Sequence, residues 1–144
     1  MKRFFPVIHC KTLEQTLQNV SLNRKSATGF FLINHNFNHK KFRKLVEDVV
    51  KSFPDTNFGI NVLDLSFEEV FNNDISAIPE LKYIWVDNCG NDGDFLVEDS
   101  ERILKIKSLR PNLELFGGFA FKYQNQPTHI STSGHFASRC LDVI

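Results

Sequence analysis

The sequence predicts an α/β domain built from parallel βα units. Short, nearly all-apolar segments alternate with segments whose apolar residues have helical spacing. The apolar segments begin at positions 4, 29, 57, 83 and 113, so they recur every 25 to 30 residues, the length of a βα unit. Because polar residues do not alternate within these segments, both faces of each strand are expected to be buried, as in a parallel sheet.

The first two units consist of a strand followed by a capped helix. Residues 4–9 form the first apolar segment, and a capping box that begins at Thr12 precedes residues with helical spacing. Residues 29–33 form the second segment. Asn38 is placed to cap a helix whose apolar residues recur at i, i+3, i+4, i+7, i+8 and i+11 and which ends before Pro54.

The same alternation continues to the end of the chain. A second capping box begins at Ser66, ahead of a short helix. Two further helices are predicted over residues 98–109 and 129–139. The remaining predicted strands cover residues 57–63, 83–86, 113–121 and 141–144.

Length and strand pattern leave two architectures open. A complete (β/α)8 barrel takes about 250 residues, and this chain has 144. We therefore predict a single domain over residues 1–144 with the architecture of a partial, truncated TIM barrel. The alternative is an open doubly wound sheet of the flavodoxin-like kind.

Composition excludes several classes of protein. Hydrophobic residues make up 42% of the chain, charged residues 24%, and the formal net charge is zero. The apolar runs are all much shorter than 18 residues, so we expect no membrane partner. The basic cluster at residues 39–44 is followed by Glu47 and Asp48 and predicts a solvated helix face. Because the chain as a whole is not basic, we expect no nucleic-acid partner.

Cysteine usage points to a reducing compartment. The three cysteines, Cys10, Cys89 and Cys140, are far apart and form no CxxC pair. We therefore expect neither a disulfide framework nor a metal finger, and a cytoplasmic location. No local spacing of His, Cys or Asp favours a metal site, and the sequence indicates no particular cofactor.

Polar side chains follow the first five predicted strands. Parallel strands end at one edge of a sheet, where α/β proteins bind ligands, although Asn and Asp there also serve as turn and cap residues. His9 and Asp87 are candidates for proton transfer, and Lys122 for a nucleophile or a phosphate partner. The candidate ligand-binding residues are Asn34, His35, Asn61, Asp64 and Asn88.

Five stretches, taken in order, are similar to a known family. PVIHCKTLEQTLQN, FFLINHNF, FGINVLDLS, YIWVDNCG and LFGGFAFKYQ resemble a little-characterised group of bacterial-type (β/α)8-barrel proteins, related in appearance to BtpA-like and other phosphate-binding barrels. The resemblance covers residues 6–144 and implies a site at the carboxyl ends of the strands. The family pattern continues beyond the sixth strand, so the resemblance also implies a chain that lacks the last two βα units.

Two functions are expected on this basis. The first is that of a truncated relative of a phosphate-binding barrel enzyme acting on a small phosphorylated or nucleotide-like ligand, with or without residual activity. The second is that of a non-catalytic partial barrel, which binds a ligand or assembles into a homo-oligomer through exposed strands.

Overall fold

A computed structural model describes residues 2–35, 37–63, 65–87, 93–118, 120 and 124–144 of the chain. It consists of a parallel sheet whose strands alternate with helices, which confirms the predicted α/β class. The elements are β1 (Val7–Cys10), α1 (Leu13–Asn23), β2 (Phe30–Asn34), α2 (His39–Ser52), β3 (Phe58–Asn61), α3 (Phe67–Asn72), a 3₁₀ turn (Asp74–Ala77), β4 (Leu81–Val86), α4 (Val97–Lys107), β5 (Glu114–Gly117) and α5 (Ile130–Ser138).

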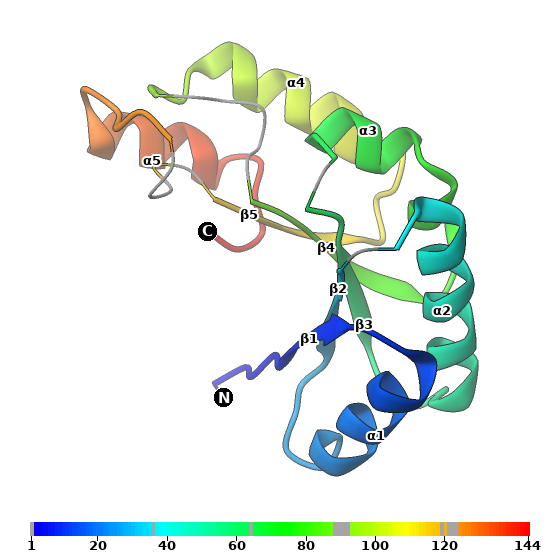
Figure 1. Cartoon of the computed structure of the whole chain (residues 1–144). Helices are drawn as coiled ribbons and strands as arrows, with labels where there is room; N and C mark the ends of the chain where they lie inside the picture. Colours follow the sequence, from blue (N-terminus) through cyan, green and yellow to red (C-terminus); the bar gives the residue numbers. More distant parts are fainter. Residues whose placement is uncertain (1, 36, 64, 88–92, 119, 121–123) are drawn as a thin grey trace.

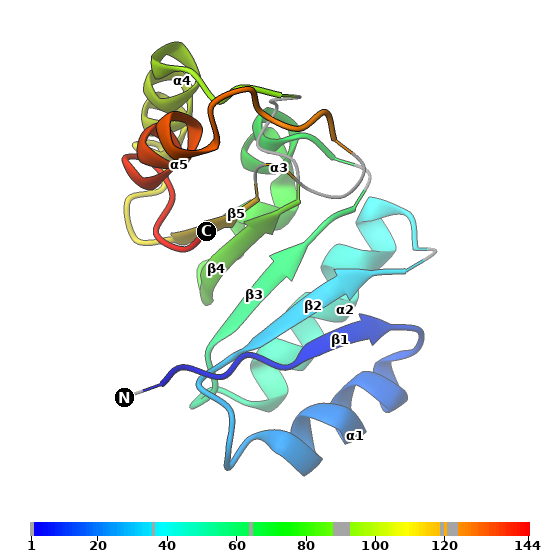
Figure 2. The ribbon, with the colours of Figure 1, turned by 90° about the vertical axis from the view of Figure 1, so that its left-hand side faces the viewer.

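The strands lie in the order in which they occur along the chain. The sheet order is β1-β2-β3-β4-β5, and each neighbouring pair is parallel. Repeated crossovers of one hand, each moving one strand further, place their helices on the same face of a sheet. Figure 1 shows α1 to α4 on one side of the strands, and Figure 2 shows the other side of the sheet turned to the viewer.

This arrangement is a partial parallel βα fold, as predicted. The five strands that the structure describes follow one another in chain order. This order fits consecutive units of a partial barrel, and a flavodoxin-like sheet is also compatible with the structure.

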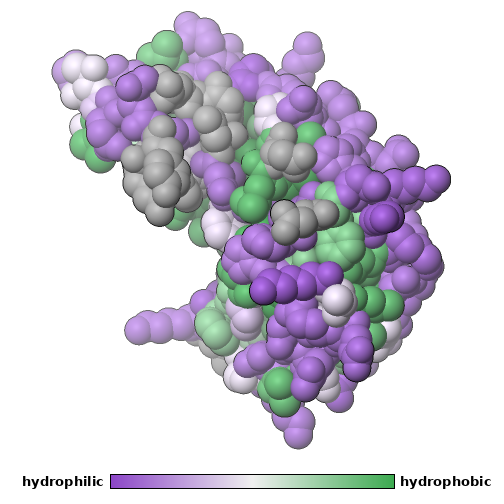
Figure 3. Space-filling model, viewed as in Figure 1, coloured by the Kyte–Doolittle hydropathy of each residue, from purple (hydrophilic) through white to green (hydrophobic). Residues whose placement is uncertain are grey.

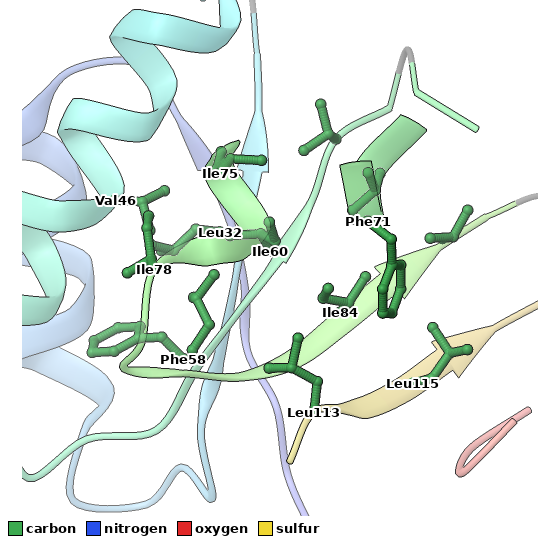
Figure 4. Close-up of a cluster of buried hydrophobic side chains, with 14 of the residues drawn as sticks. Leu32, Val46, Phe58, Ile60, Phe71, Ile75, Ile78, Ile84, Leu113 and Leu115 are labelled. Carbon is green, nitrogen blue, oxygen red and sulfur yellow. The ribbon is translucent and has the colours of Figure 1, made fainter. Parts of the chain in front are cut away.

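The hydrophobic core lies between the sheet and the helices. Figure 4 shows side chains of β2 to β5 meeting side chains of the helices and of the 3₁₀ turn. Helix α2 contributes the largest share because its 3.6-residue pattern brings five apolar side chains to one face. These five buried residues are Phe42, Leu45, Val46, Val49 and Val50.

The helix caps read from the sequence are present. Asn38 Oδ1 accepts the Lys41 backbone N–H at 2.9 Å, and the capping box at Ser66 is complete. At α1, Thr12 Oγ1 accepts the Gln15 N–H at 3.1 Å. The Gln15 side chain, however, accepts from the Lys11 N–H at 3.2 Å rather than from Thr12, so only half of the predicted box forms.

The end of the chain differs from the prediction. Of the strand expected over residues 113–121, β5 covers Glu114–Gly117, and residues 141–144 form a single bridge, Phe116 to Val143, instead of a strand. The Asp142 carboxylate accepts the Leu115 N–H at 2.7 Å and so takes the place of a strand carbonyl. Lys107 Nζ holds the same carboxylate at 2.6 Å.

Candidate functional site

The sheet has a second face, which is turned away from α1 to α4. Successive side chains of a strand point to opposite faces, so the neighbours of core residues lie on this second face. We call it the open face. Cross-strand pairing aligns its residues in two rows. The first row is Val7, Phe31, Gly59, Tyr83 and Glu114; the second is His9, Ile33, Asn61, Trp85 and Phe116.

Aromatic rings dominate the middle of the open face. The Phe31 ring lies 4.9 Å from Phe116 and 5.5 Å from Trp85, centroid to centroid. Both contacts are edge-to-face, the geometry that the ring quadrupoles favour. The rings of Phe31 and Tyr83 pack across the strand between them, where Gly59 has no side chain.

An N-terminal arm, residues 3–6, crosses the amino end of the open face. The Phe4 carbonyl accepts the Thr28 N–H at 2.7 Å, and Arg3 forms an ion pair with Glu114 at 2.7 Å. Between these anchors the Phe5 ring packs edge-on against Tyr83 at 5.0 Å. The arm thereby covers the centre of the first row, where Phe31 is only 2% exposed, whereas Val7 at the edge of the row is 42% exposed.

The open face holds a pocket of about 420 Å³ that reaches from Phe5 of the arm to Trp85 and Gly117, near the carboxyl ends of β4 and β5. Trp85 and Phe116 are half-buried there, in contrast to the buried Phe31 and Tyr83 of the first row. In Figure 3 the left side of the molecule is hollowed between its upper and lower parts. A volume of this size suits a small molecule with one ring system. The lining residues are Phe5, Val7, Phe31, Trp85, Phe116, Gly117, Gly118, Val143 and Ile144.

Two polar pairs stand at the carboxyl ends of the strands, outside the lining of this pocket. The buried Asn61 side chain donates a hydrogen bond from Nδ2 to Asp87 Oδ1 at 2.9 Å. This bond fixes the orientation of the Asp87 carboxylate, two residues beyond Trp85 in the sequence. On the neighbouring strands, the rings of His9 and His35 meet edge-to-face with centroids 5.7 Å apart.

The structure thus brings four of the predicted site residues into two pairs, one on β1–β2 and one on β3–β4. Asn34 is also at the rim but has a structural role, because its side chain accepts the Phe37 N–H at 3.2 Å and donates to the Phe37 carbonyl at 3.1 Å. The other three predicted residues, Asp64, Asn88 and Lys122, lie outside the described residues.

The aromatic side chains that line one wall of the pocket, Phe31, Trp85 and Phe116, are not among the site residues predicted from the sequence. These three residues lie in apolar strands, for which the sequence predicts that both faces are buried. A signal was present, since strands of a half-covered sheet carry a second set of side chains at every other position. In an all-apolar strand, composition alone does not separate the face that meets helices from the face that lines a pocket.

Cys10 is at the same rim but is not a nucleophile. Its side chain is fully buried, and burial raises the pKa of the thiol to about 11. The thiol therefore stays protonated near neutral pH and behaves as a small apolar group.

A larger groove, about 710 Å³, lies at the amino ends of α1 and α2 and carries four lysines. Its other polar groups already have partners: Asn38 caps α2, Thr12 caps α1, and Lys44 pairs with Asp48 at 2.6 Å. It is therefore the solvated helix face expected from the sequence, and we place the candidate site on the open face.

Comparison with known proteins adds no family: no protein-family model matches the chain, and no curated protein matches it. Within the described residues, no three or more His, Cys, Asp or Glu side chains are grouped to hold a metal ion. Each described helix is too short or too polar to cross a membrane.

Proposed function

We propose that this protein binds a small nucleotide-like molecule on its open face. The ring of the ligand would lie against Trp85 and Phe116, and its polar part would face the strand ends. The observation that carries the proposal is the aromatic-walled pocket of about 420 Å³ on the open face. Its Trp85 and Phe116 wall lies toward the carboxyl ends of the strands, the edge at which α/β folds bind ligands.

The chemistry of the lining supports a flat, partly polar ligand. Half-buried aromatic rings offer faces and edges on which a heterocycle can stack. The Asp87 carboxylate accepts hydrogen bonds, and its orientation is held by Asn61. Asp87 does not itself line the pocket. A base or sugar that extends from the rings to the strand end would reach it with an N–H or O–H donor, as in other sites where a few polar groups orient an otherwise apolar ligand.

The resemblance to phosphate-binding barrels favours a phosphorylated form of this ligand. Lys122, the predicted phosphate partner, comes five positions in the sequence after Gly117, the last residue of the strand that carries Phe116. If the chain also catalyses a reaction, Asp87 and His9 are the groups that would accept or donate a proton. Binding is the primary proposal because it needs only the pocket.

Trp85 is the single tryptophan, so its fluorescence reports on the pocket directly. We would titrate adenosine, uridine and their 5′-monophosphates into the protein, exciting at the red edge of the Trp85 absorption. A saturable change is expected. Tighter binding of the monophosphates than of the nucleosides would support the phosphorylated class, and equal binding would remove the phosphate from the proposal.

Variants separate pocket binding from a general effect. Phe116→Ala should weaken binding about tenfold, because aromatic stacking contributes about 1–3 kcal/mol per base. Phe4→Ala is the matched control, since Phe4 is 55% exposed on the arm and does not line the pocket. Equal affinity in both variants, or no saturable response to any of the four compounds, would refute the proposal.

A further inference from the structure

His9 and His35 come to the same place from two strands. His9 is the third residue of β1 and pairs with Ile33 of β2, and His35 lies two residues beyond Ile33. Side chains two residues apart on an extended chain point to the same face, so the two imidazoles are diagonal cross-strand neighbours. Both side chains are exposed at the rim.

The two rings are already near the separation that a shared metal ion requires. A divalent metal lies about 2.0–2.1 Å from each imidazole nitrogen, which puts two rings bound at adjacent positions roughly 5 Å apart, centroid to centroid. Here the centroids are 5.7 Å apart and the ring planes are nearly perpendicular, at 88°. Small side-chain rotations bring one nitrogen of each ring to a common point.

The backbone that carries the pair is held in place. Strands β1 and β2 pair continuously from Val7–Phe31 to Cys10–Asn34. The two hydrogen bonds between the Asn34 side chain and the Phe37 backbone fix the turn that contains His35. A metal would therefore meet a largely preformed pair and would not have to order a loose chain.

The imidazole nitrogens are available. Among the residues that the structure describes, neither ring takes part in a hydrogen bond or an ion pair; the ring-to-ring contact is what holds them together. The ring contact leaves the nitrogens of both exposed imidazoles accessible to a metal ion.

We propose that His9 and His35 form a two-histidine site for a divalent transition metal, with Cu²⁺ bound most tightly, and with Ni²⁺ and Zn²⁺ also bound. Imidazole ligands suit these borderline ions, and affinity follows the order that peaks at Cu²⁺. Ca²⁺ and Mg²⁺ require oxygen ligands and are not expected to bind here.

With two protein ligands, the ion keeps open coordination positions. These positions would be filled by water or by a group of a bound small molecule, as at zinc sites that retain an exchangeable ligand. The expected binding is reversible, and the fold does not depend on it. The inference uses the two histidines alone and stands independently of the proposed nucleotide-like ligand.

The test is titration of chelator-treated protein with Cu²⁺, followed by calorimetry and electron paramagnetic resonance. One equivalent should bind with a spectrum typical of two nitrogen ligands. His9→Ala and His35→Ala should each weaken binding at least about tenfold, because each removes one of the two ligands.

His135→Ala is the matched control, since His135 is an exposed histidine on α5, remote in sequence from the pair. It should leave the affinity unchanged. Thermal melts of the variants without metal should match that of the parent chain, because both imidazoles are exposed. The proposal is overturned if the two single variants bind Cu²⁺ as tightly as the parent, if only one of them loses affinity, or if His135→Ala has the same effect.

Discussion

Replacement of Gly59 by alanine should destabilise the protein by about 3 kcal/mol. Gly59 is paired with Phe31 on one side and Tyr83 on the other, in the middle of the sheet. A Cβ atom there would lie 2.5 Å from Tyr83 Cβ, 2.7 Å from Phe31 Cε1 and 2.9 Å from the Tyr83 carbonyl oxygen. Overpacking a core costs about 1–3 kcal/mol, and the upper end applies because two of the three atoms cannot move without the β4 backbone.

The measurement is urea unfolding of Gly59→Ala, followed by Trp85 fluorescence and far-UV circular dichroism. The midpoint should fall while the slope stays constant, as expected for lower stability without a change in exposed surface. Gly134→Ala in α5 is the control, because alanine in a helix interior is favoured over glycine by about 0.5–1 kcal/mol. If Gly59→Ala stays within about 0.5 kcal/mol of the parent, the close packing at the centre of the open face is wrong.

Two further predictions concern a buried thiol and the end of the chain. Burial raises the pKa of Cys10 from 9.0 to about 11, so the unfolded chain releases this proton at lower pH than the folded chain. The free energy of unfolding should therefore fall by about 2–3 kcal/mol through this group between pH 9 and 11, and should not change through it at lower pH. Cys10→Ala should lose this part of the pH dependence. Asp142→Ala should lower the free energy of unfolding in urea by about 1–2 kcal/mol, because it removes a charge-assisted hydrogen bond from the Leu115 N–H and leaves the partly buried Lys107 without its carboxylate partner. Asp55→Ala, in the loop before β3, is the control. An equal loss of stability in both variants would contradict the role given to Asp142.

The fold was largely predictable because local signals agreed with one another. Caps at Asn38 and Ser66, the helical stripe of α2 and the recurrence of apolar strands all indicate βα units, and all are present. The ends of the elements were less predictable. Residues 141–144 have the composition of a strand, but the Asp142 side chain competes with the backbone for the Leu115 N–H, and a tertiary contact of that kind leaves no mark in local sequence.

The polar residues at the strand ends could be predicted from the sequence, but the aromatic residues that line the pocket could not. Parallel strands end at one edge, so His9, His35, Asn61 and Asp87 could be placed there before the structure was known. Which of them contact one another depends on sheet register, and a shift of one residue would reverse the face of every side chain. The aromatic wall and the arm that closes it arise from contacts between distant parts of the chain, which periodicity does not reveal.

The strand order also has a consequence for how the molecule is made. Every strand pairs with its immediate predecessor along the chain, so each new strand that leaves the ribosome finds its partner already synthesised. Most of the sheet can therefore form from contacts of short sequence separation, which favours rapid folding. The arm is the exception, because the Arg3–Glu114 contact spans 111 residues and must wait until β5 exists. We therefore expect the Arg3–Glu114 ion pair and the packing of Phe5 on Phe116 to form late in folding, once β5 has been made.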